Sequence, residues 1–335
     1  MNKSDQNVLV DSFGRHHDYL RISLTERCNL RCVYCMPEQG VVLQPQSHFM
    51  TREELVHIAS VFVKLGVKKI RLTGGEPLVR KDVEAVIEDL AKLPVKLAIS
   101  TNGVLVNQFI QTFKKCNLKA INISLDSLRE DRFNLISRRT YFEAIINNVE
   151  LLIEEGFHLK LNAVLMKGFN DDELIDFIEF TRNRPVHFRF IEFMPFNGNQ
   201  WDWSKGFAYH EMMDNINAHY GATVVKLEDC KNDTSKSYKV EGFKGTFAVI
   251  STVTNPFCDT CNRIRLTADG KIKNCLFSAN ETDLLTALRS GKEIEESIRE
   301  SIWNKKSTRG GMETFEEFSN KDLNQKNRSM INIGG

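Results

Sequence analysis

Hydrophobic and polar residues alternate along six short runs in the first two-thirds of the chain, a pattern typical of half-buried strands. The runs are residues 18–24, 67–73, 95–100, 118–124, 158–164 and 186–192. Amphipathic stretches of helical period lie between them, for example at 51–66, 81–93 and 142–156. Strands that alternate with helices form a parallel sheet, because each return to the next strand needs a crossover. The sequence therefore predicts a series of β/α units.

The side chains of these strands divide by parity into an apolar face and a polar face. In the first strand, Leu20 and Ile22 alternate with Arg21 and Ser23. Strands that are covered by helices on both faces are continuously apolar instead. We therefore expect one face to meet the helices and the other to line a wet, charged lumen. The prediction is an α/β fold with a curved, partial (β/α)6 barrel whose lumen is the binding site.

The polar parity carries an excess of cations. Five of them, from four strands, are predicted to point inward: Arg21, Lys69, Arg71, Lys160 and Arg189. Enclosed charges are costly unless they are compensated, and arginine forks suit phosphate oxygens, so an anionic ligand is expected. The alternative is that single cations pair with Asp126, Glu26 or Glu192, or reach solvent.

Composition and charge narrow the class of protein. The 335 residues are 41% hydrophobic and 27% charged, with a net charge of +1, which gives no general case for nucleic acid or a membrane surface as a partner. No apolar run approaches the ~20 residues of a membrane span, and no signal-peptide core is seen, so a cytoplasmic protein is expected. Six of eight cysteines fall in two tight groups, which indicates metal ligation in a reducing compartment.

The first group is Cys28, Cys32 and Cys35, just past the first strand. Three thiolates can hold three corners of a [4Fe–4S] cluster and leave the fourth iron without a protein ligand. An open metal position is typical of a site that binds and activates a ligand. This triad therefore predicts a reactive cluster.

The second group is Cys258, Cys261 and Cys275, again with no clear fourth ligand. Arg263 and Arg265 follow at once and, two residues apart, face the same way in an extended segment. A second cluster with cations beside it would bind an anionic or electron-rich substrate over its open iron.

Zinc is the alternative for both groups. His48 is the nearest downstream candidate for a fourth ligand of the first group, whereas His16 and His17 are expected on the surface of a loop. The second group would be a zinc ribbon that lacks one ligand. Cys116 and Cys230 belong to neither group and are expected to be structural or free thiols.

Two loops follow predicted strands and complete the candidate site. TGGEP occupies residues 73–77, and Thr101-Asn102-Gly103 occupies the equivalent position one unit later. Glycines allow close approach of backbone to a ligand, and ligands of parallel α/β folds sit at the carboxyl ends of strands. A Gly-Gly turn before a helix most often merely caps that helix, and the position of TGGEP one β/α unit after the first triad is what makes it specific. The Thr101 loop, without context, is equally well interpreted as a plain turn.

Longer motifs resemble those of a known family. The radical S-adenosylmethionine (SAM) superfamily has motifs similar to CNLRCVYC and KKIRLTGGEP. With RFIEFMP, CDTCNRIRLTADGKIKNCLF and a final Gly-Gly, the chain resembles the GTP 3′,8-cyclases of molybdenum cofactor biosynthesis. The resemblance covers residues from about 13 to 195, about 250 to 280, and the last few.

The resemblance implies a role for each matching residue. In that family the first triad holds a [4Fe–4S] cluster that binds SAM, and the second holds a cluster that meets guanine. The implied SAM contacts are Tyr34, Gly75, Ser124 and Met194. The implied GTP contacts are Arg21, Arg71, Thr101, Lys160, Arg263 and Arg265, assisted by Lys69 and Arg189. The implied catalytic residues are Arg263, Arg265, Gly334 and Gly335, since the family's Gly-Gly tail enters the pocket.

The implied reaction converts GTP to 3′,8-cyclo-7,8-dihydro-GTP through a 5′-deoxyadenosyl radical formed from SAM. It implies a flavodoxin- or ferredoxin-type electron donor and coupling to the downstream cyclic pyranopterin monophosphate synthase; a homodimer is left open. The expected domains are a radical SAM core at 1–225, an auxiliary-cluster region at 226–325 and a tail at 326–335.

Two rival functions stay open at this point. Another radical SAM enzyme, such as a peptide maturase with an auxiliary cluster, would share both triads but would not need the phosphate-type cations. A non-catalytic zinc protein or electron carrier would leave the TGGEP loop and the charged lumen unexplained.

Overall fold

Six parallel strands form the centre of one twelve-stranded sheet in the computed structural model, which describes residues 8–36, 44–199 and 201–334. They are β1 (Tyr19–Ser23), β2 (Lys69–Thr73), β3 (Lys96–Thr101), β4 (Ala120–Ser124), β5 (His158–Leu165) and β6 (His187–Glu192). Each of the first five pairs in parallel with the next strand in the chain. All six fall on the alternating runs, so the predicted α/β fold is confirmed.

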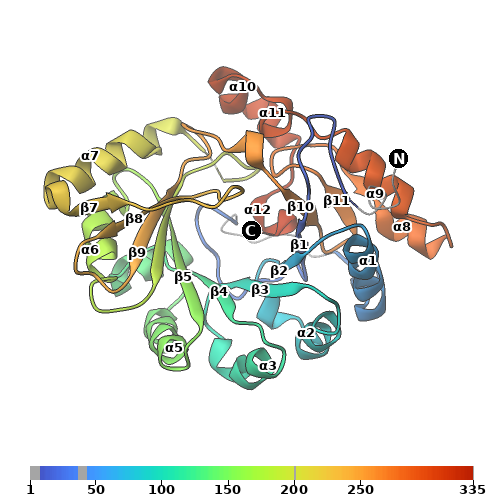
Figure 1. Cartoon of the computed structure of the whole chain (residues 1–335), viewed down its shortest axis with the longest axis horizontal. Coiled ribbons are helices and arrows are strands. Elements are labelled where there is room, and N and C mark those ends of the chain that lie inside the picture. The colour runs from blue at the N-terminus through green and yellow to red at the C-terminus, as the bar shows by residue number, and fades with distance from the viewer. Residues whose placement is uncertain (1–7, 37–43, 200, 335) are drawn as a thin grey trace.

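Helices cover the outside of the curved sheet (Figure 1). Those of the first two-thirds are α1 (Arg52–Lys64), α2 (Val83–Leu90), α3 (Ile110–Lys115), α4 (Glu130–Ser137), α5 (Phe142–Glu154), α6 (Leu174–Glu179) and α7 (Tyr209–Tyr220). Helix α1 begins with a capping box between Thr51 and Glu54, which satisfies two backbone donors at its N-terminus. Its residues Leu55, Ile58 and Phe62 are fully buried. One apolar stripe therefore holds this helix against the sheet.

The apolar parity of the strands forms the core between sheet and helices. Leu20, Ile22, Ile70 and Leu72 are all 0% exposed, as the alternation predicts. Burying a side chain of this size contributes about 1.5–3 kcal/mol relative to leaving it exposed. The alternate side chains of these strands therefore face the inside of the curved sheet.

The last third of the chain extends the sheet at both edges. At one edge β9 (Thr246–Ile250) lies parallel to β6 and is followed by antiparallel β8 (Lys236–Val240) and β7 (Val224–Lys226). At the other edge β10 (Arg263–Leu266) lies parallel to β1 and is followed by antiparallel β11 (Lys271–Lys273) and β12 (Thr282–Asp283). The segment that carries the second cysteine group thus pairs, through β10, with β1, the strand that precedes the first cysteine group.

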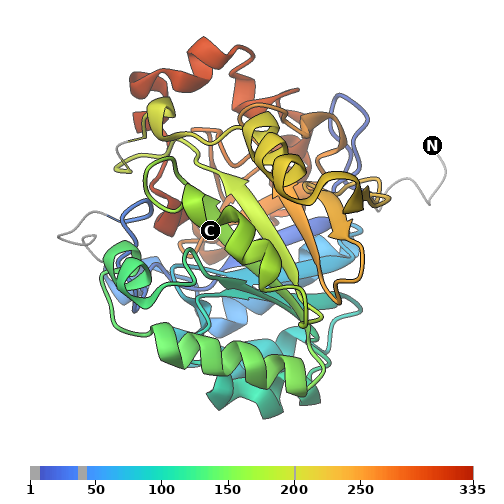
Figure 2. The same cartoon turned by 90° about the vertical axis from the view of Figure 1, so that its left-hand side faces the viewer.

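The remaining α-helices all lie beyond residue 283. They are α8 (Leu284–Arg289), α9 (Glu295–Trp303), α10 (Phe315–Ser319), α11 (Lys321–Gln325) and α12 (Met330–Ile333). Figure 2 shows α10 and α11, in red, at the end of the molecule opposite to α5, in green. The sheet is continuous across residue 225, where the first domain was expected to end, and the three-domain division stays a prediction.

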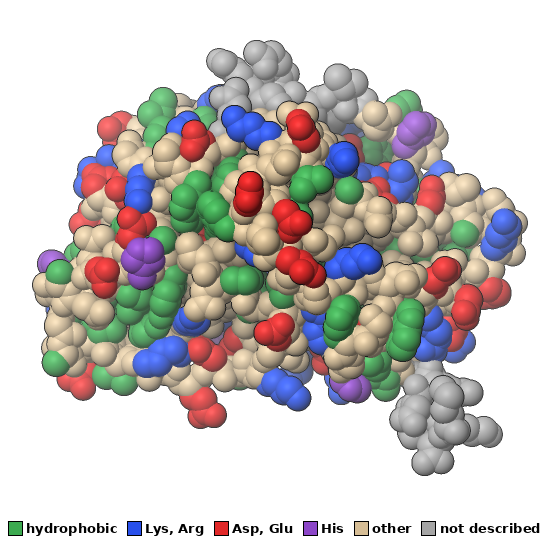
Figure 3. Space-filling model, turned by 90° about the horizontal axis from the view of Figure 1, so that it is seen from above, with side chains coloured by type: hydrophobic (Ala, Val, Ile, Leu, Met, Phe, Trp, Pro, Cys, Tyr) green, Lys and Arg blue, Asp and Glu red, His purple; other side chains and the backbone are tan. Residues whose placement is uncertain are grey.

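Charges of both signs are interspersed over the face seen in Figure 3. This mixture agrees with the net charge of +1. Among the described residues, the structure has no helix with the length and apolar character needed to cross a membrane.

Candidate functional site

The first cysteine triad lies in the loop that follows β1. Cys28, Cys32 and Cys35 are all half-buried. The loop winds tightly, since the backbone N–H of Cys35 donates to the carbonyl of Cys32 at 3.0 Å. The Cys28 sulfur accepts from the backbone of Leu30 at 3.4 Å and approaches Asn102 Nδ2 at 3.9 Å. The motif therefore brings the three thiols near enough that Cys28 and Cys35 raise the pKa of Cys32, and Cys28 raises that of Cys35.

The surroundings of this triad fit an iron–sulfur cluster. Burial raises the pKa of Cys28 to about 11 and that of Cys35 to about 12. Burial, Asp126 and the two other thiols raise the pKa of Cys32 far above its usual range. Such thiolates are stable only beside compensating positive charge, which iron ions supply. In the described ranges, no three or more His, Cys, Asp or Glu side chains are grouped as ligands of a single metal ion would be.

The TGGEP loop packs directly against the loop that begins the triad. The Gly75 N–H donates to the Thr25 carbonyl at 2.7 Å, and the Glu76 N–H donates to the Arg27 carbonyl at 2.8 Å. A Cβ atom on Gly74 would lie 2.7 Å from the Thr25 oxygen, and one on Gly75 would lie 2.5 Å from the Arg27 oxygen. The glycines are therefore required by contact between the two loops, and the SAM contact of Gly75 stays a prediction.

Glu76 organises the rim between the two predicted loops. Its buried carboxylate accepts from the Thr101 hydroxyl at 2.7 Å and from the Asn102 N–H at 2.6 Å. Burial raises the pKa of Glu76 to about 7. The amide of Asn102 in turn donates to Asn29 Oδ1, inside the cysteine motif, at 2.6 Å. Thr101 thus supports the cluster loop through Glu76, and its GTP contact stays a prediction.

The predicted SAM contacts share one edge of the sheet. Tyr34 and Gly75 follow β1 and β2, Ser124 ends β4, and Met194 follows β6. The Tyr34 hydroxyl donates to Asp126 at 2.6 Å, and burial raises the pKa of Asp126 to about 6. Tyr34 also lines a cavity of about 560 Å³ beside the triad. Parallel strands place all four residues at the carboxyl edge, where ligands of such folds bind.

The predicted cations lie in rows across adjacent strands. Arg21 on β1 is in register with Arg71 on β2 and with Arg265 on β10. Two residues earlier on β1, Tyr19 is in register with Lys69 on β2 and with Arg263 on β10. Residues in register on neighbouring strands share a face of the sheet. The parity argument therefore extends to both arginines of the second cysteine motif.

Tyr19 holds this group together, although sequence reasoning did not single it out. Its hydroxyl accepts from Arg71 Nε at 2.6 Å, and the Lys69 Nζ lies 4.7 Å from the centre of its ring. Arg71 also donates to the carbonyl of Ile99 at 2.7 Å. Burial opposes ionisation of Tyr19, but Arg71, Arg21 and Lys69 outweigh it and lower its pKa to about 7. The sequence feature that could have indicated Tyr19 is its position two residues before Arg21, on the same face of the strand.

Among the described residues, the cations of the lumen outnumber the carboxylates that act on them, and Asp233 is the carboxylate that influences both Lys160 and Arg189. Burial lowers the pKa of Arg189 to about 9, although Arg189 donates to Asn162 at 2.8 Å. Lys160 keeps solvent access within the lumen, yet desolvation and Arg189 lower its pKa to about 8. Asp126 and Glu192, considered as partners, instead accept from Tyr34 and from the backbone around Val253. This imbalance fits a polyanionic ligand.

The second triad lies beside β10 and β11. Cys258 and Cys261 bracket a short turn, and Cys275 follows β11; all three are half-buried. Lys305 Nζ donates to the Cys261 sulfur at 3.4 Å and to the Arg263 carbonyl at 3.0 Å. Burial would raise the pKa of Cys261, but Lys305 and Arg263 outweigh it and lower this pKa to about 7. A thiolate held beside a cation is suited to metal ligation.

The two triads lie at opposite ends of the barrel strands. The first follows β1, whereas Cys258 and Cys261 precede β10, which runs parallel to β1. A strand of this length spans roughly 16 Å at about 3.3 Å per residue. The rows of cations occupy the interval, so a ligand held by them is within reach of both triads.

One expectation about the histidines is wrong. His16 is exposed as predicted, but His17 is only 1% exposed and its Nε2 lies 3.0 Å from the buried Asp11 carboxylate. Its Nδ1 lies 3.5 Å from Lys305 Nζ. The segment before β1 folds back over the second triad, a long-range contact that no local pattern indicates.

The end of the chain enters the lumen, and Figure 1 shows α12 inside the curve of the sheet. The carbonyl of Gly334 accepts from Arg265 at 2.9 Å. A Cβ atom there would lie 2.7 Å from the Thr73 hydroxyl and 2.8 Å from Ser23 Cβ. Gly334 also has a φ of +83°, which favours glycine. Gly335, predicted to act with it, lies outside the described residues.

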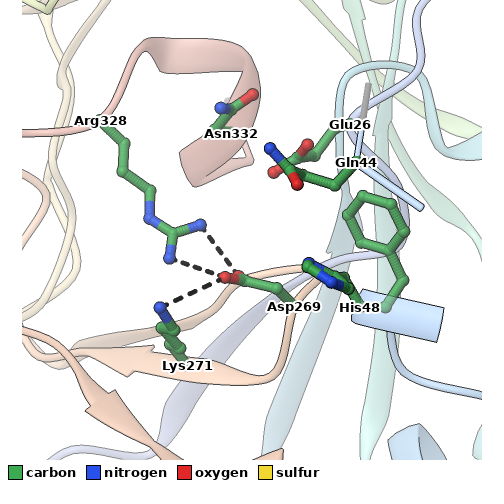
Figure 4. Close-up of a pocket in the computed structure, with 8 residues that line it drawn as sticks. Glu26, Gln44, His48, Asp269, Lys271, Arg328 and Asn332 are labelled. Atoms are coloured by element: carbon green, nitrogen blue, oxygen red, sulfur yellow. Dashed lines mark hydrogen bonds and ion pairs between the residues drawn. The ribbon is translucent and has the colours of Figure 1, made fainter. Parts of the chain in front are cut away.

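A cluster of ion pairs anchors the base of this tail. Arg328 donates to both carboxylate oxygens of Asp269, at 2.9 and 2.8 Å, and to Glu281 at 2.6 Å. Figure 4 shows Arg328 and Asp269 at a cavity of about 310 Å³ that Asn332 and His48 also line. His48, the candidate zinc ligand, therefore faces the tail anchor.

We expect Arg328→Gln to loosen the tail. The variant leaves two partly buried carboxylates without their cation, which costs on the order of 1–3 kcal/mol. Amide hydrogen exchange at residues 330–334 should accelerate at least about fivefold, which corresponds to the lower end of this cost. Arg182→Gln, which removes a surface pair with Glu179, is the control and should leave that exchange unchanged. Unaltered exchange in Arg328→Gln would contradict the anchoring role.

Known proteins match this chain along its length. A model described as the radical SAM superfamily matches residues 22–181, and one described as Molybdenum Cofactor Synthesis C matches residues 186–310. The structure of SuiB from Streptococcus suis bound to S-adenosylmethionine has a TM-score of 0.60 at 16% identity, covering 88% of this chain and 69% of that one. At this identity the likeness concerns the fold alone.

Curated relatives are considerably more similar in sequence. The mitochondrial GTP 3′,8-cyclase of Arabidopsis thaliana is 43% identical over 98% of this chain and 84% of its own length. The GTP 3′,8-cyclase of Listeria welshimeri is 40% identical over 89% of this chain and 91% of its own length. Molybdenum cofactor biosynthesis protein 1 of Drosophila melanogaster is 48% identical over 88% of this chain and 52% of its own length. The chain thus spans about half the length of some relatives.

The partial barrel, the CxxxCxxC loop and the matching model together define a radical SAM protein. The second cysteine motif and the high identity to both cyclases narrow the assignment. The chain belongs to the GTP 3′,8-cyclase family of molybdenum cofactor biosynthesis.

Proposed function

We propose that this chain converts GTP to 3′,8-cyclo-7,8-dihydro-GTP, the first step of molybdenum cofactor biosynthesis. The observation that supports this most is the row of Arg265, Arg21 and Arg71 on adjacent strands, in the interval between two cysteine triads. A triphosphate carries roughly three to four negative charges, which suits a lumen lined by several cations. A substrate with a single carboxylate would not need them.

The two cysteine triads are proposed to hold the cofactors on either side of this substrate. Cys28, Cys32 and Cys35 would hold one [4Fe–4S] cluster, and Cys258, Cys261 and Cys275 another. When bound, these cofactors supply reductive cleavage of SAM to a 5′-deoxyadenosyl radical at the first site and an open iron for guanine at the second. Tyr34, Gly75, Ser124 and Met194 are proposed to contact SAM at the carboxyl edge of the sheet.

The lumen residues would bind and orient GTP. Arg21, Lys69, Arg71, Lys160, Arg189 and Arg263 are proposed to bind the anionic substrate, with Thr101 at the rim. Arg265 is fixed by the Gly334 carbonyl, so its guanidinium is held in one orientation before substrate arrives. Holding reactants in a fixed geometry is worth several orders of magnitude in rate. The ribose 3′ carbon and carbon 8 of guanine are the atoms to be joined.

The proposal extends to partners and location. An external donor of the flavodoxin or ferredoxin type would supply electrons, and the cyclic pyranopterin monophosphate synthase would consume the product. We propose that the chain acts in the cytoplasm, as a monomer or a homodimer. Radical SAM peptide maturation, the rival function, gains no support from the likeness to SuiB, because at 16% identity that likeness concerns the fold alone.

An anaerobic reaction tests the proposal. Reconstituted protein is mixed with SAM, GTP and dithionite, and the products formed from SAM and from GTP are analysed by mass spectrometry. The expected products are 5′-deoxyadenosine and an isomer of GTP with unchanged mass; ATP in place of GTP should give no isomer. If 5′-deoxyadenosine appears while GTP stays intact, the substrate assignment is wrong. If neither product forms in iron-loaded protein, the enzyme assignment is wrong.

A further inference from the structure

A buried lysine lies against the second cysteine triad. Lys305, just beyond α9, is only 3% exposed. Its ammonium nitrogen has three neighbours within hydrogen-bonding range: the Cys261 sulfur at 3.4 Å, the Arg263 carbonyl at 3.0 Å and His17 Nδ1 at 3.5 Å. A full positive charge is thus removed from water and aimed at a thiol.

The acidic group nearest to this network is already paired. Asp11 accepts from Arg15 Nε at 2.6 Å and lies 3.0 Å from His17 Nε2. The hydrogen on Nε2 of His17 is assigned toward Asp11, which leaves Nδ1 to accept from Lys305. In the described part of the chain, no carboxylate lies within ion-pair distance of Lys305. The compensating negative charge for Lys305 is therefore the triad itself.

Among the described residues, no ammonium or guanidinium group donates a hydrogen bond to a sulfur of the first triad. The hydrogen bonds found there involve neutral groups: the Leu30 backbone and the Asn102 amide at Cys28, and the Tyr34 side chain at Cys32. At the second triad, by contrast, the neutral Arg309 N–H donates to the Cys258 sulfur at 3.4 Å, in addition to the Lys305 ammonium. Among the described contacts, the two triads thus differ by one hydrogen bond from a buried ammonium group to a ligand sulfur.

We propose that Lys305 raises the reduction potential of the cluster at the second triad, so that this cluster is reduced before the first. One-electron reduction adds a negative charge to a cluster, and hydrogen bonds and cations at its sulfurs stabilise the reduced form. The electron comes from the external reductant, which is oxidised in the same step. This inference rests on the iron–sulfur occupancy in the proposed function.

Lys305→Met tests the proposal, because methionine keeps the length of the side chain and removes the charge. The full chain carries Cys28→Ala, Cys32→Ala and Cys35→Ala as background, so that the second cluster alone is titrated with dithionite and followed by electron paramagnetic resonance. At a fixed potential we expect the ratio of reduced to oxidised cluster to fall about tenfold, which is ~59 mV for a one-electron couple.

Two control variants isolate the charge. Lys305→Arg keeps it and should restore the ratio to within about threefold of the parent, which is ~30 mV by the same conversion. Lys306→Met removes a lysine one residue away that is exposed, and should leave the ratio unchanged. An unchanged ratio in iron-loaded Lys305→Met overturns the inference. A parent chain that binds no iron overturns the proposed function instead, so the two failures are distinguishable.

A measurement on the unsubstituted second triad covers the case in which Lys305→Met fails to load iron. The parent is labelled with ¹⁵N-lysine and reduced, and electron spin-echo modulation is recorded without SAM or GTP. A ¹⁵N coupling to the cluster supports the contact between Lys305 and Cys261. Its absence overturns the proposal.

Discussion

Replacing Cys275 with alanine should abolish the conversion of GTP while cleavage of SAM remains measurable. Cys275 is one of three thiols in the second triad, and continuing the register of β10 and β11 places it beside Arg263. Its loss should remove the second cluster and leave the first intact. Substrate that is no longer held near the reacting atoms typically reacts about 100-fold more slowly or worse. Iron content and both products are the measurements.

Cys230→Ala is the matched control for this prediction. Cys230 is an exposed free cysteine in the loop between β7 and β8, remote in sequence from both triads. We expect two clusters per chain and parent activity in this variant. A Cys275→Ala chain that kept both clusters and turned GTP over normally would remove Cys275 from the site.

Replacing Gly334 with alanine should lower the turnover of GTP at least about 100-fold without loss of iron, since misplacement by an ångström near the reacting groups has effects of this size. An alanine Cβ would lie within 2.8 Å of both Ser23 and Thr73, and the backbone is in the left-handed region. The tail must therefore shift, and Arg265 then loses its hydrogen bond to the Gly334 carbonyl. The measurement is kcat with iron content determined in parallel.

Gly291→Ala separates backbone strain from steric overlap. Gly291 has a φ of +71°, and a Cβ atom there meets nothing within 4 Å. This control should cost roughly 1 kcal/mol of stability and leave turnover unchanged. Deletion of Gly334 and Gly335 should have the same effect as Gly334→Ala, with cluster content retained. Equal turnover by the truncated chain would show that the tail has no part in the reaction.

Sequence reasoning succeeded where the information is local or periodic. Parity along five-residue strands was sufficient to place Arg21 and Arg71 on one face, because successive side chains of a strand point to opposite sides. Cysteine spacing predicted two ligand sets, and the ligation of metal by these cysteines stays a prediction. Family resemblance supplied the rest of the candidate site, including the predicted roles of Thr101 and Gly75. In the structure, the Thr101 hydroxyl donates to Glu76 and the Gly75 N–H donates to the Thr25 carbonyl.

The features that were missed depend on contacts across the chain. His17 was expected at the surface, yet it is buried against Asp11 and Lys305, the latter 288 residues away. Arg328 meets Asp269 from a segment with no recognisable motif. Such contacts arise only when the last third of the chain joins the sheet and β10 pairs with β1. No pattern within a window of a few turns contains that information.

The two outermost strands of the sheet have a consequence for behaviour in concentrated solution. Unpaired strand edges invite pairing with a second molecule, and proteins limit this by keeping such edges short. Strand β12 is two residues long and β7 is three, with Asp283 and Lys226 among them. A large sheet thus offers little template for edge-to-edge association. The chain is accordingly expected to resist aggregation through its sheet even while its cofactor loops are empty.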